Sequence, residues 1–145
     1  MEVSMNPLLG TWKLKSYVVT PATGEKSTPY GEHPVGYLGY SADGRMQAIG
    51  TSVGRTAPLD LAPTDEERAA LHKTMFAYAG TYSVQAGKVT HHVDISWNEV
   101  WNATDQVRFY EVNGNTLTLT SRAIDPTSGT EAQYVVVWEK VTSPR

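Results

Sequence analysis

Residues 81–97 read TYSVQAGKVTHHVDISW, and this stretch decides the fold class. Apolar and polar residues alternate in two runs, with the period of a β-strand that buries one face. The runs are joined by Ala86-Gly87, a pair that suits a two-residue hairpin turn. With that turn Tyr82 lies opposite His91, so the stretch predicts two antiparallel strands that carry both rings on one face.

Period-two alternation continues along most of the chain, and Asp43-Gly44 and Asn113-Gly114 mark two further tight hairpins. The expected strands are 10–20, 36–42, 45–52, 79–86, 88–97, 105–112, 115–122 and 132–141. About eight short strands in 145 residues predict a single all-β domain over residues 1–145. The favoured architecture is an antiparallel up-and-down β-barrel, because closure leaves no exposed edge strand; a β-sandwich is the alternative.

One segment, PTDEERAALHKTMFAYAG, has a helical pattern. Thr64 and Glu67 have the spacing of a capping box. Apolar residues then recur on one face at Leu71, Met75 and Tyr78. We expect a short helix over 64–78 that caps an end of the barrel, either as a lid over a cavity or as a simple plug.

The two adjacent histidines should face opposite sides of the sheet, because neighbouring side chains alternate along a strand. His91 shares the apolar face with Val93 and Trp97 and is expected inside the barrel. His92 shares the polar face with Asp94 and is expected in solvent. The pair therefore cannot chelate one ion, and we expect no metal site.

The hairpin around Asn113-Gly114 leaves the direction of Arg108 open. One of its faces carries Gln106, Arg108, Tyr110, Leu117 and Leu119, and the other carries Val107, Phe109 and three threonines. If the leucines mark the interior, Arg108 points inward and needs a buried acceptor or a ligand oxygen. If Val107 and Phe109 mark it, Arg108 is solvated. A third arrangement keeps Arg108 inward near one end, over a tryptophan.

Composition excludes several classes of function. The net charge is −3, so the chain lacks the basic surface that binds nucleic acids or membranes. There is no cysteine, no signal-peptide pattern and no run of roughly 20 apolar residues, which predicts a cytoplasmic protein. No phosphate-binding glycine loop or Gly-X-Ser-X-Gly motif is present, and we expect no cofactor. The oligomeric state is open.

Gly10-Thr11-Trp12 at the start of the first strand resembles the Gly-X-Trp signature of lipocalins. From Leu9 to Val141 the chain resembles the lipocalin-like domain family of short bacterial and fungal barrels. The matching stretches are LLGTWKLKSY, PYGEHPVGYLGYSADGRM, the PTDEE helix, YAGTYSV, VTHHVDISW, TDQVRFYEVNGNTLTLTS and VVWEKV. The resemblance implies a barrel with a central cavity and a role with small molecules. It also implies that a basic side chain covers Trp12: Lys140 by position, or else Arg108 or Arg122.

The first functional hypothesis is a barrel that binds a small apolar or aromatic molecule. The expected ligand-binding residues are Tyr37, Met46, Tyr82, His91, Val93, Trp97, Arg108 and Tyr110. Trp97 and Trp101 flank the next turn, where they either guard the cavity mouth or staple the loop.

The alternative is a cofactor-independent lyase, isomerase or cyclase. His91 would be its general base, Tyr82 its neighbour, and Arg108 or a tyrosine would stabilise an oxyanion. His91 has an equally simple reading as a core histidine that is hydrogen-bonded to a tyrosine. A third hypothesis is a structural module whose interior is packed solid.

Overall fold

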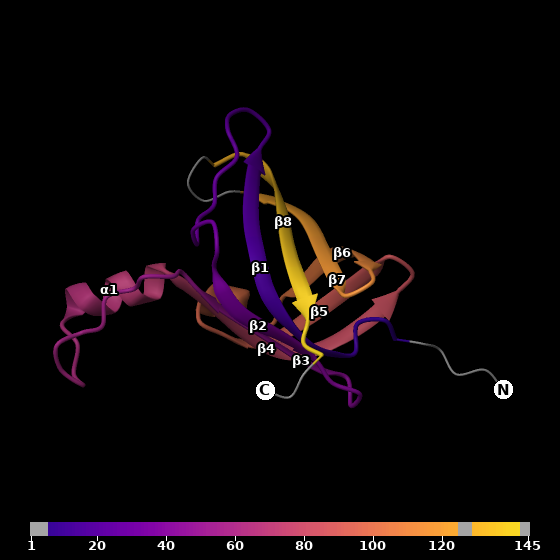
Figure 1. Ribbon diagram of the computed structural model, residues 1–145, viewed down its shortest axis with the longest axis horizontal. Helices are drawn as coiled ribbons and strands as arrows, with labels where there is room; N and C mark the ends of the chain where they lie inside the picture. Colours follow the sequence, from indigo (N-terminus) through magenta and orange to yellow (C-terminus); the bar gives the residue numbers. More distant parts are fainter. Residues whose placement is uncertain (1–5, 125–128, 143–145) are drawn as a thin grey trace.

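Each strand pairs with the next strand along the chain, and the last strand pairs with the first, so the sheet closes into an antiparallel barrel (Figure 1). The computed structural model describes residues 6–124 and 129–142. In that part of the chain the strands are β1 (Gly10–Pro21), β2 (Val35–Tyr40), β3 (Arg45–Thr51), β4 (Met75–Gln85), β5 (Lys88–Ser96), β6 (Asp105–Asn113), β7 (Thr116–Ile124) and β8 (Glu131–Lys140). The predicted eight-stranded up-and-down barrel is confirmed.

The opening hairpin has the predicted register, with Tyr82 opposite His91 and Val84 opposite Val89. The β6–β7 turn is Gly114-Asn115, one residue later than the favoured position. That shift changes the partners and leaves the faces as predicted. Gly114 has a φ of 63°, which a residue with a Cβ rarely adopts. The glycine therefore occupies the turn position that most needs it.

The helix α1 (Asp65–Lys73) is shorter than the predicted 64–78, and it does not cap the barrel. Its capping box is present, with the Glu67 amide donating to Thr64 Oγ1 at 3.1 Å. The helix extends away from the barrel wall (Figure 1), and none of its residues is buried. The reason is its composition: DEERAALHK is charged on nearly every side and offers no apolar face to cover an opening.

Met75 and Tyr78 belong to β4 and not to the helix. β3 provides the reason, because Thr51 pairs with Met75 and Ala48 pairs with Tyr78. The ladder between these strands outweighs the local helical pattern of the same residues.

Two β-bulges change which side chains point inward. In β1 the pairing with β8 skips Lys15, so the inward positions change from Trp12 and Leu14 to Tyr17. In β5 the pairing with β4 skips Asp94, so Ile95 points outward and is 63% exposed. An extra residue in one strand reverses the alternation beyond it, and a period-two reading cannot detect that.

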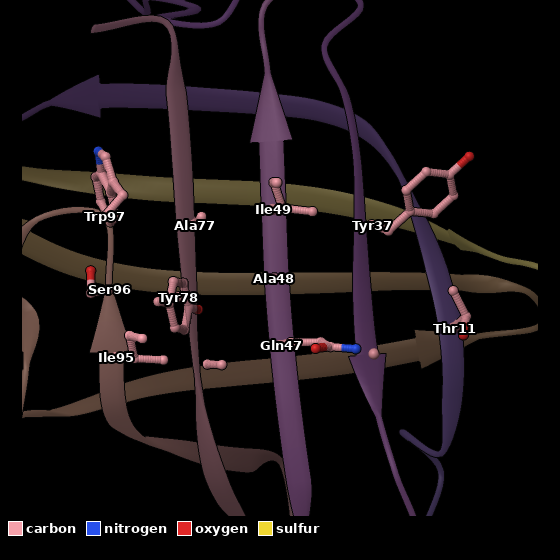
Figure 2. Close-up of a pocket in the computed structure, with 12 residues that line it drawn as sticks. Thr11, Tyr37, Gln47, Ala48, Ile49, Ala77, Tyr78, Ile95, Ser96 and Trp97 are labelled. Carbon is pink, nitrogen blue, oxygen red and sulfur yellow. The ribbon is translucent and has the colours of Figure 1, made fainter. Parts of the chain in front are cut away.

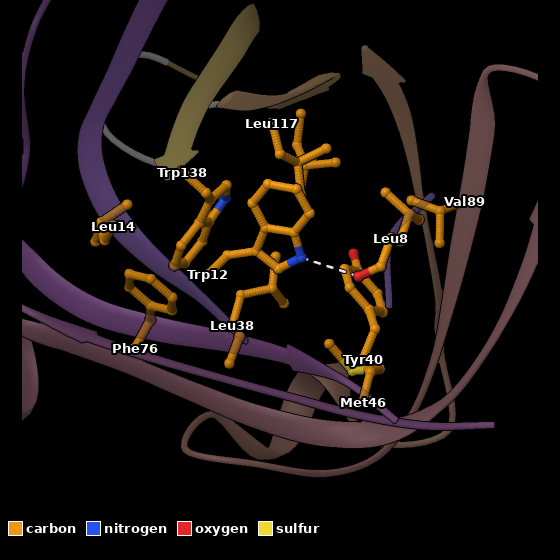
Figure 3. Packing of buried hydrophobic residues seen from close by; sticks show 12 residues of the cluster. Leu8, Trp12, Leu14, Leu38, Tyr40, Met46, Phe76, Val89, Leu117 and Trp138 are labelled. Carbon is orange, nitrogen blue, oxygen red and sulfur yellow. Dashed lines mark hydrogen bonds between the residues drawn. The ribbon is translucent and has the colours of Figure 1, made fainter. Parts of the chain in front are cut away.

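One half of the interior is packed solid, as Figure 3 shows. Trp12 lies at its centre, 1% exposed, and donates its indole N–H to the Leu8 carbonyl at 2.9 Å. The Lys140 ammonium lies 4.8 Å from the centre of the Trp12 ring and donates to the Leu9 carbonyl at 2.6 Å. The basic residue that covers Trp12 is therefore Lys140, the positional match, and neither arginine replaces it.

Replacing Lys140 with methionine should lower the free energy of unfolding by about 1 kcal/mol, because the variant loses a cation–π contact and a charge-assisted hydrogen bond. Lys13→Met is the matched control, since Lys13 is exposed on the neighbouring strand. Urea denaturation of the two variants measures the difference. Equal stabilities would show that Lys140 contributes nothing to this end of the barrel.

Candidate functional site

The other half of the barrel interior is a cavity of about 530 Å³. Eight of the twenty described residues that line it are aromatic: Tyr17, Tyr30, Phe76, Tyr78, Trp97, Trp101, Tyr134 and Trp138. Polar groups are few, mainly Gln106, Arg108 and Ser121. Its lining includes the β1–β2 loop, the short 3-10 helix η1 (Glu99–Trp101) and the end of β7, so it lies at the end of the barrel opposite the tight hairpin turns.

The rings of the lining pack on one another as well as on the cavity. Tyr17 and Tyr30 lie edge to face with centroids 4.9 Å apart. Trp97 and Trp101 also lie edge to face, at 5.4 Å, and Tyr78 is 5.2 Å from Trp101. The two tryptophans thus staple the turn after β5 and line the cavity at the same time. Mutual contacts hold these rings in place, which favours a preformed site.

Arg108 points into the barrel, which settles its direction. Gln106, Arg108 and Tyr110 form the inner face of β6, whereas Val107 and Phe109 are 41% and 57% exposed on the outside. The Arg108 guanidinium carbon lies 5.9 Å from the centre of the Trp101 ring, and Nη1 donates to the Val107 carbonyl at 3.1 Å. Among residues 6–124 and 129–142, no carboxylate forms an ion pair with Arg108.

The two histidines of the opening stretch diverge as predicted. His91 has no exposed surface, and it lies between two tyrosine hydroxyls: Tyr40 at 2.6 Å from Nε2 and Tyr78 at 2.8 Å from Nδ1. His92 lies on the outer surface, where its ring contacts Ser83 Oγ at 2.7 Å and Asp105 Oδ1 at 2.8 Å. No group of three potential metal ligands occurs in the described part of the chain.

Burial determines the protonation of these groups. It lowers the pKa of His91 to about 3, and the positive charge of Arg108 lowers this pKa further. Burial also raises the pKa values of the Tyr17, Tyr40 and Tyr78 hydroxyls. At neutral pH the imidazole of His91 is therefore neutral and the hydroxyls of these tyrosines are protonated, while Arg108 is a cation that lines the cavity.

The structure brings only two of the eight expected binding residues to the cavity, Trp97 and Arg108. Five others point inward but belong to the packed half or lie beneath the lining: Met46, Tyr82, His91, Val93 and Tyr110. Tyr82 lies opposite His91 as predicted, but its hydroxyl donates to the Ser41 carbonyl at 2.8 Å and accepts from Asn6.

The expected inward orientation of Tyr37 is corrected, since this ring is 52% exposed. It borders a second hollow, on the outer wall of β2 to β5, where Figure 2 shows it near Gln47 and Ile49. Inward positions on β2 are Leu38 and Tyr40, one residue out of phase with Tyr37. The β2–β3 turn holds three residues, Ala42-Asp43-Gly44, and not only the predicted Asp43-Gly44, because Tyr40 pairs with Met46 and the Ser41 amide donates to the Arg45 carbonyl. The extra residue reverses the phase of β2 relative to β3.

The sequence reading missed four tyrosines of the cavity, Tyr17, Tyr30, Tyr78 and Tyr134. The bulge at Lys15 concealed Tyr17, the helical pattern concealed Tyr78, and Tyr30 lies in a loop without periodicity. A usable signal did exist for Tyr78. It lies in YAGTYSV, four residues before Tyr82, so extending the period-two reading backwards would have placed both on one face.

Comparisons with known proteins agree with this geometry. The family model of the lipocalin-like domain matches residues 9–141, nearly the whole chain. A comparison with curated proteins finds no match. No helix in the described residues is long and apolar enough to cross a membrane. The closed eight-stranded barrel, the buried Trp12 and the family match lead to one conclusion: the chain belongs to the lipocalin-like domain family.

Proposed function

We propose that the protein binds a small aromatic or apolar molecule in the cavity at the open half of the barrel. The observation that carries this proposal is a cavity of about 530 Å³ lined by aromatic rings, with Arg108 as the one cation among its described lining residues. Cavities of this size hold ligands of drug-like dimensions, and rings with polar edges orient as well as bury such molecules. A barrel packed solid, the purely structural alternative, would have no such volume.

The enzyme alternative with His91 as general base has less support. His91 does not line the cavity, and Tyr78 lies between its ring and the open space. A base with a pKa of about 3 is also a weak proton acceptor at neutral pH. The arrangement therefore favours binding over acid–base catalysis by this histidine, and His91 has the features of a core residue.

The neutral fluorophore N-phenyl-1-naphthylamine tests the proposal, because its two aromatic groups match an apolar, ring-lined site. We expect saturable binding with a Kd on the order of 1–10 µM. Ser121→Phe, which adds a ring to a residue that lines the cavity, should weaken this binding at least tenfold. Thr120→Phe adds the same ring to the outer face of the same strand and is the control.

Folding of both variants is checked by circular dichroism before titration. Loss of binding in Ser121→Phe alone supports the proposal. Equal binding by both variants would locate the probe outside the cavity and contradict it, as would a wild-type protein that does not bind the probe.

A further inference from the structure

Tyr78 connects the packed core to the cavity. Its ring lines the cavity, while its hydroxyl lies 2.8 Å from Nδ1 of His91. The other ring nitrogen of His91 lies 2.6 Å from the hydroxyl of Tyr40, which is 2% exposed. Tyr40, His91 and Tyr78 thus form one hydrogen-bonded chain that begins in the core and ends at the cavity wall.

The direction of the protons in this chain follows from what each end can reach. A neutral imidazole has one N–H and one acceptor nitrogen. Within the described residues the Tyr40 hydroxyl has no hydrogen-bond partner other than His91, so Tyr40 must donate to Nε2. A reversed chain would leave a buried O–H without an acceptor, which is costly. Nδ1 therefore carries the imidazole proton and donates it to the Tyr78 oxygen.

Arg108 acts on the same oxygen from the cavity side. Both groups line the cavity and flank the Trp101 ring, whose centre lies 5.2 Å from that of the Tyr78 ring and 5.9 Å from the Arg108 guanidinium carbon. Burial raises the pKa of the Tyr78 hydroxyl, and the charge of Arg108 acts in the opposite direction. The Tyr78 oxygen accepts from His91, and its own proton is not used in this chain. A hydrogen bond accepted by a phenol oxygen strengthens the remaining O–H as a donor. Arg108 itself is an inward cation with no carboxylate partner among the described residues.

We propose that the Tyr78 hydroxyl and the Arg108 guanidinium form a donor pair for an anionic oxygen, so that the ligand is an aromatic or apolar molecule that carries an acidic group. This inference deepens the proposed function and rests on it. The ligand oxygen would accept the hydrogen bond of Tyr78 and neutralise the charge of Arg108. The apolar body of the ligand would lie against Trp101, Tyr17 and Phe76, which line the same space.

Two probes with the same aromatic rings distinguish this inference from the proposed function on which it rests. N-phenyl-1-naphthylamine is neutral, and 8-anilino-1-naphthalenesulfonate is nearly the same molecule with a sulfonate. The wild-type protein should bind the sulfonate probe at least tenfold more tightly than the neutral one. Arg108→Gln should weaken binding of the sulfonate probe at least tenfold, and Tyr78→Phe about fivefold to tenfold. Each substitution should weaken binding of the neutral probe much less than binding of the sulfonate probe.

Tyr37→Phe is the matched control, because it removes a hydroxyl from a tyrosine that lies outside the cavity, on the outer wall of the barrel. It should leave both probes unaffected. Ser121→Phe should weaken both probes, which shows that the sulfonate probe enters the cavity and does not bind the hollow on the outer wall. Tyr78→Phe keeps its ring and its packing, so it tests the inference even if Arg108→Gln fails to fold.

The inference is overturned if Arg108→Gln or Tyr78→Phe weakens the two probes equally, or leaves the sulfonate probe unchanged. A wild-type protein that prefers the neutral probe would overturn it as well. In each of these outcomes the neutral probe still reports whether the cavity binds aromatic molecules. Absence of neutral-probe binding would instead contradict the proposed function, so the two failures are distinguishable.

Discussion

His91→Ala is expected to lower the free energy of unfolding by about 3 kcal/mol, whereas His92→Ala should change it by less than about 0.5 kcal/mol. The imidazole of His91 is fully buried and satisfies two tyrosine hydroxyls. Its removal leaves the Tyr40 hydroxyl buried without a partner and opens a void among packed rings. His92 lies at the surface, where water can replace its contacts with Ser83 and Asp105.

Urea denaturation of both variants at pH 7 measures this difference between neighbouring residues. The two substitutions are chemically identical, so only the face of the strand distinguishes them. A comparable loss for both would mean that the Tyr40–His91–Tyr78 chain contributes little to stability. A larger loss for His92→Ala would contradict the assignment of the two faces.

Acid should destabilise the protein through the same histidine. The pKa of His91 is about 3 in the folded state and about 6.5 in the unfolded chain. Between these values the unfolded chain binds a proton that the folded protein excludes. The stabilising contribution of the neutral imidazole is therefore complete above about pH 6.5 and is lost as the pH falls towards 3. The slope approaches about 1.4 kcal/mol per pH unit, which gives about 2 kcal/mol between pH 7 and pH 5.

His91→Gln isolates this effect. The glutamine amide carries an acceptor oxygen and a donor NH2 group, so it can replace the neutral imidazole between the two tyrosines, and it does not titrate. The difference in unfolding free energy between wild type and His91→Gln should shrink by about 2 kcal/mol from pH 7 to pH 5. His92→Gln is the control and should follow the wild type. Parallel curves for wild type and His91→Gln would show that the imidazole is not held neutral in the fold.

The expected effects of the His91 substitutions bear on the binding site, because His91 is hydrogen-bonded to Tyr78, which lines the cavity. A neutral His91 with its proton on Nδ1 leaves the Tyr78 O–H available to a ligand. A charged His91 would donate from both nitrogens and take away the acceptor that Tyr40 needs. Protonation would thus disturb the core before it changed the cavity. Binding of the neutral probe should persist over the whole pH range in which the protein remains folded.

The hairpin at residues 81–97 shows how far local pattern extends. Its turn, its register and the opposite directions of His91 and His92 all followed from alternation and two turn residues. The direction of Arg108 did not follow, because both faces of its strand carry large apolar residues. Closure decided it. Leu117 and Leu119 are buried at 0% and 5% exposure, and Arg108 shares their side of the sheet.

The candidate site depended on features that act over longer distances. Ile95 and Tyr17 were placed by bulges, and a bulge exists only where one strand is paired against another. Tyr78 was placed by the ladder of β4 with β3, which outweighed a helical pattern in the same residues. Depth along the barrel also mattered, since Met46 and Tyr82 point inward yet lie in the packed half.

The family resemblance implied that Lys140, Arg108 or Arg122 covers Trp12, and the pairing of β8 with β1 decided on Lys140. The sequence by itself predicted an antiparallel up-and-down barrel, the order of its strands and the register of its central hairpin. These depend on period, turn chemistry and nearest neighbours, which a linear chain displays. Only the tertiary structure decided which half of the interior stays open, and that the chain from Tyr40 through His91 ends at Tyr78, which lines the cavity together with Arg108. Those residues come from four different strands, β2, β5, β4 and β6, and their relative depth is set when the sheet closes.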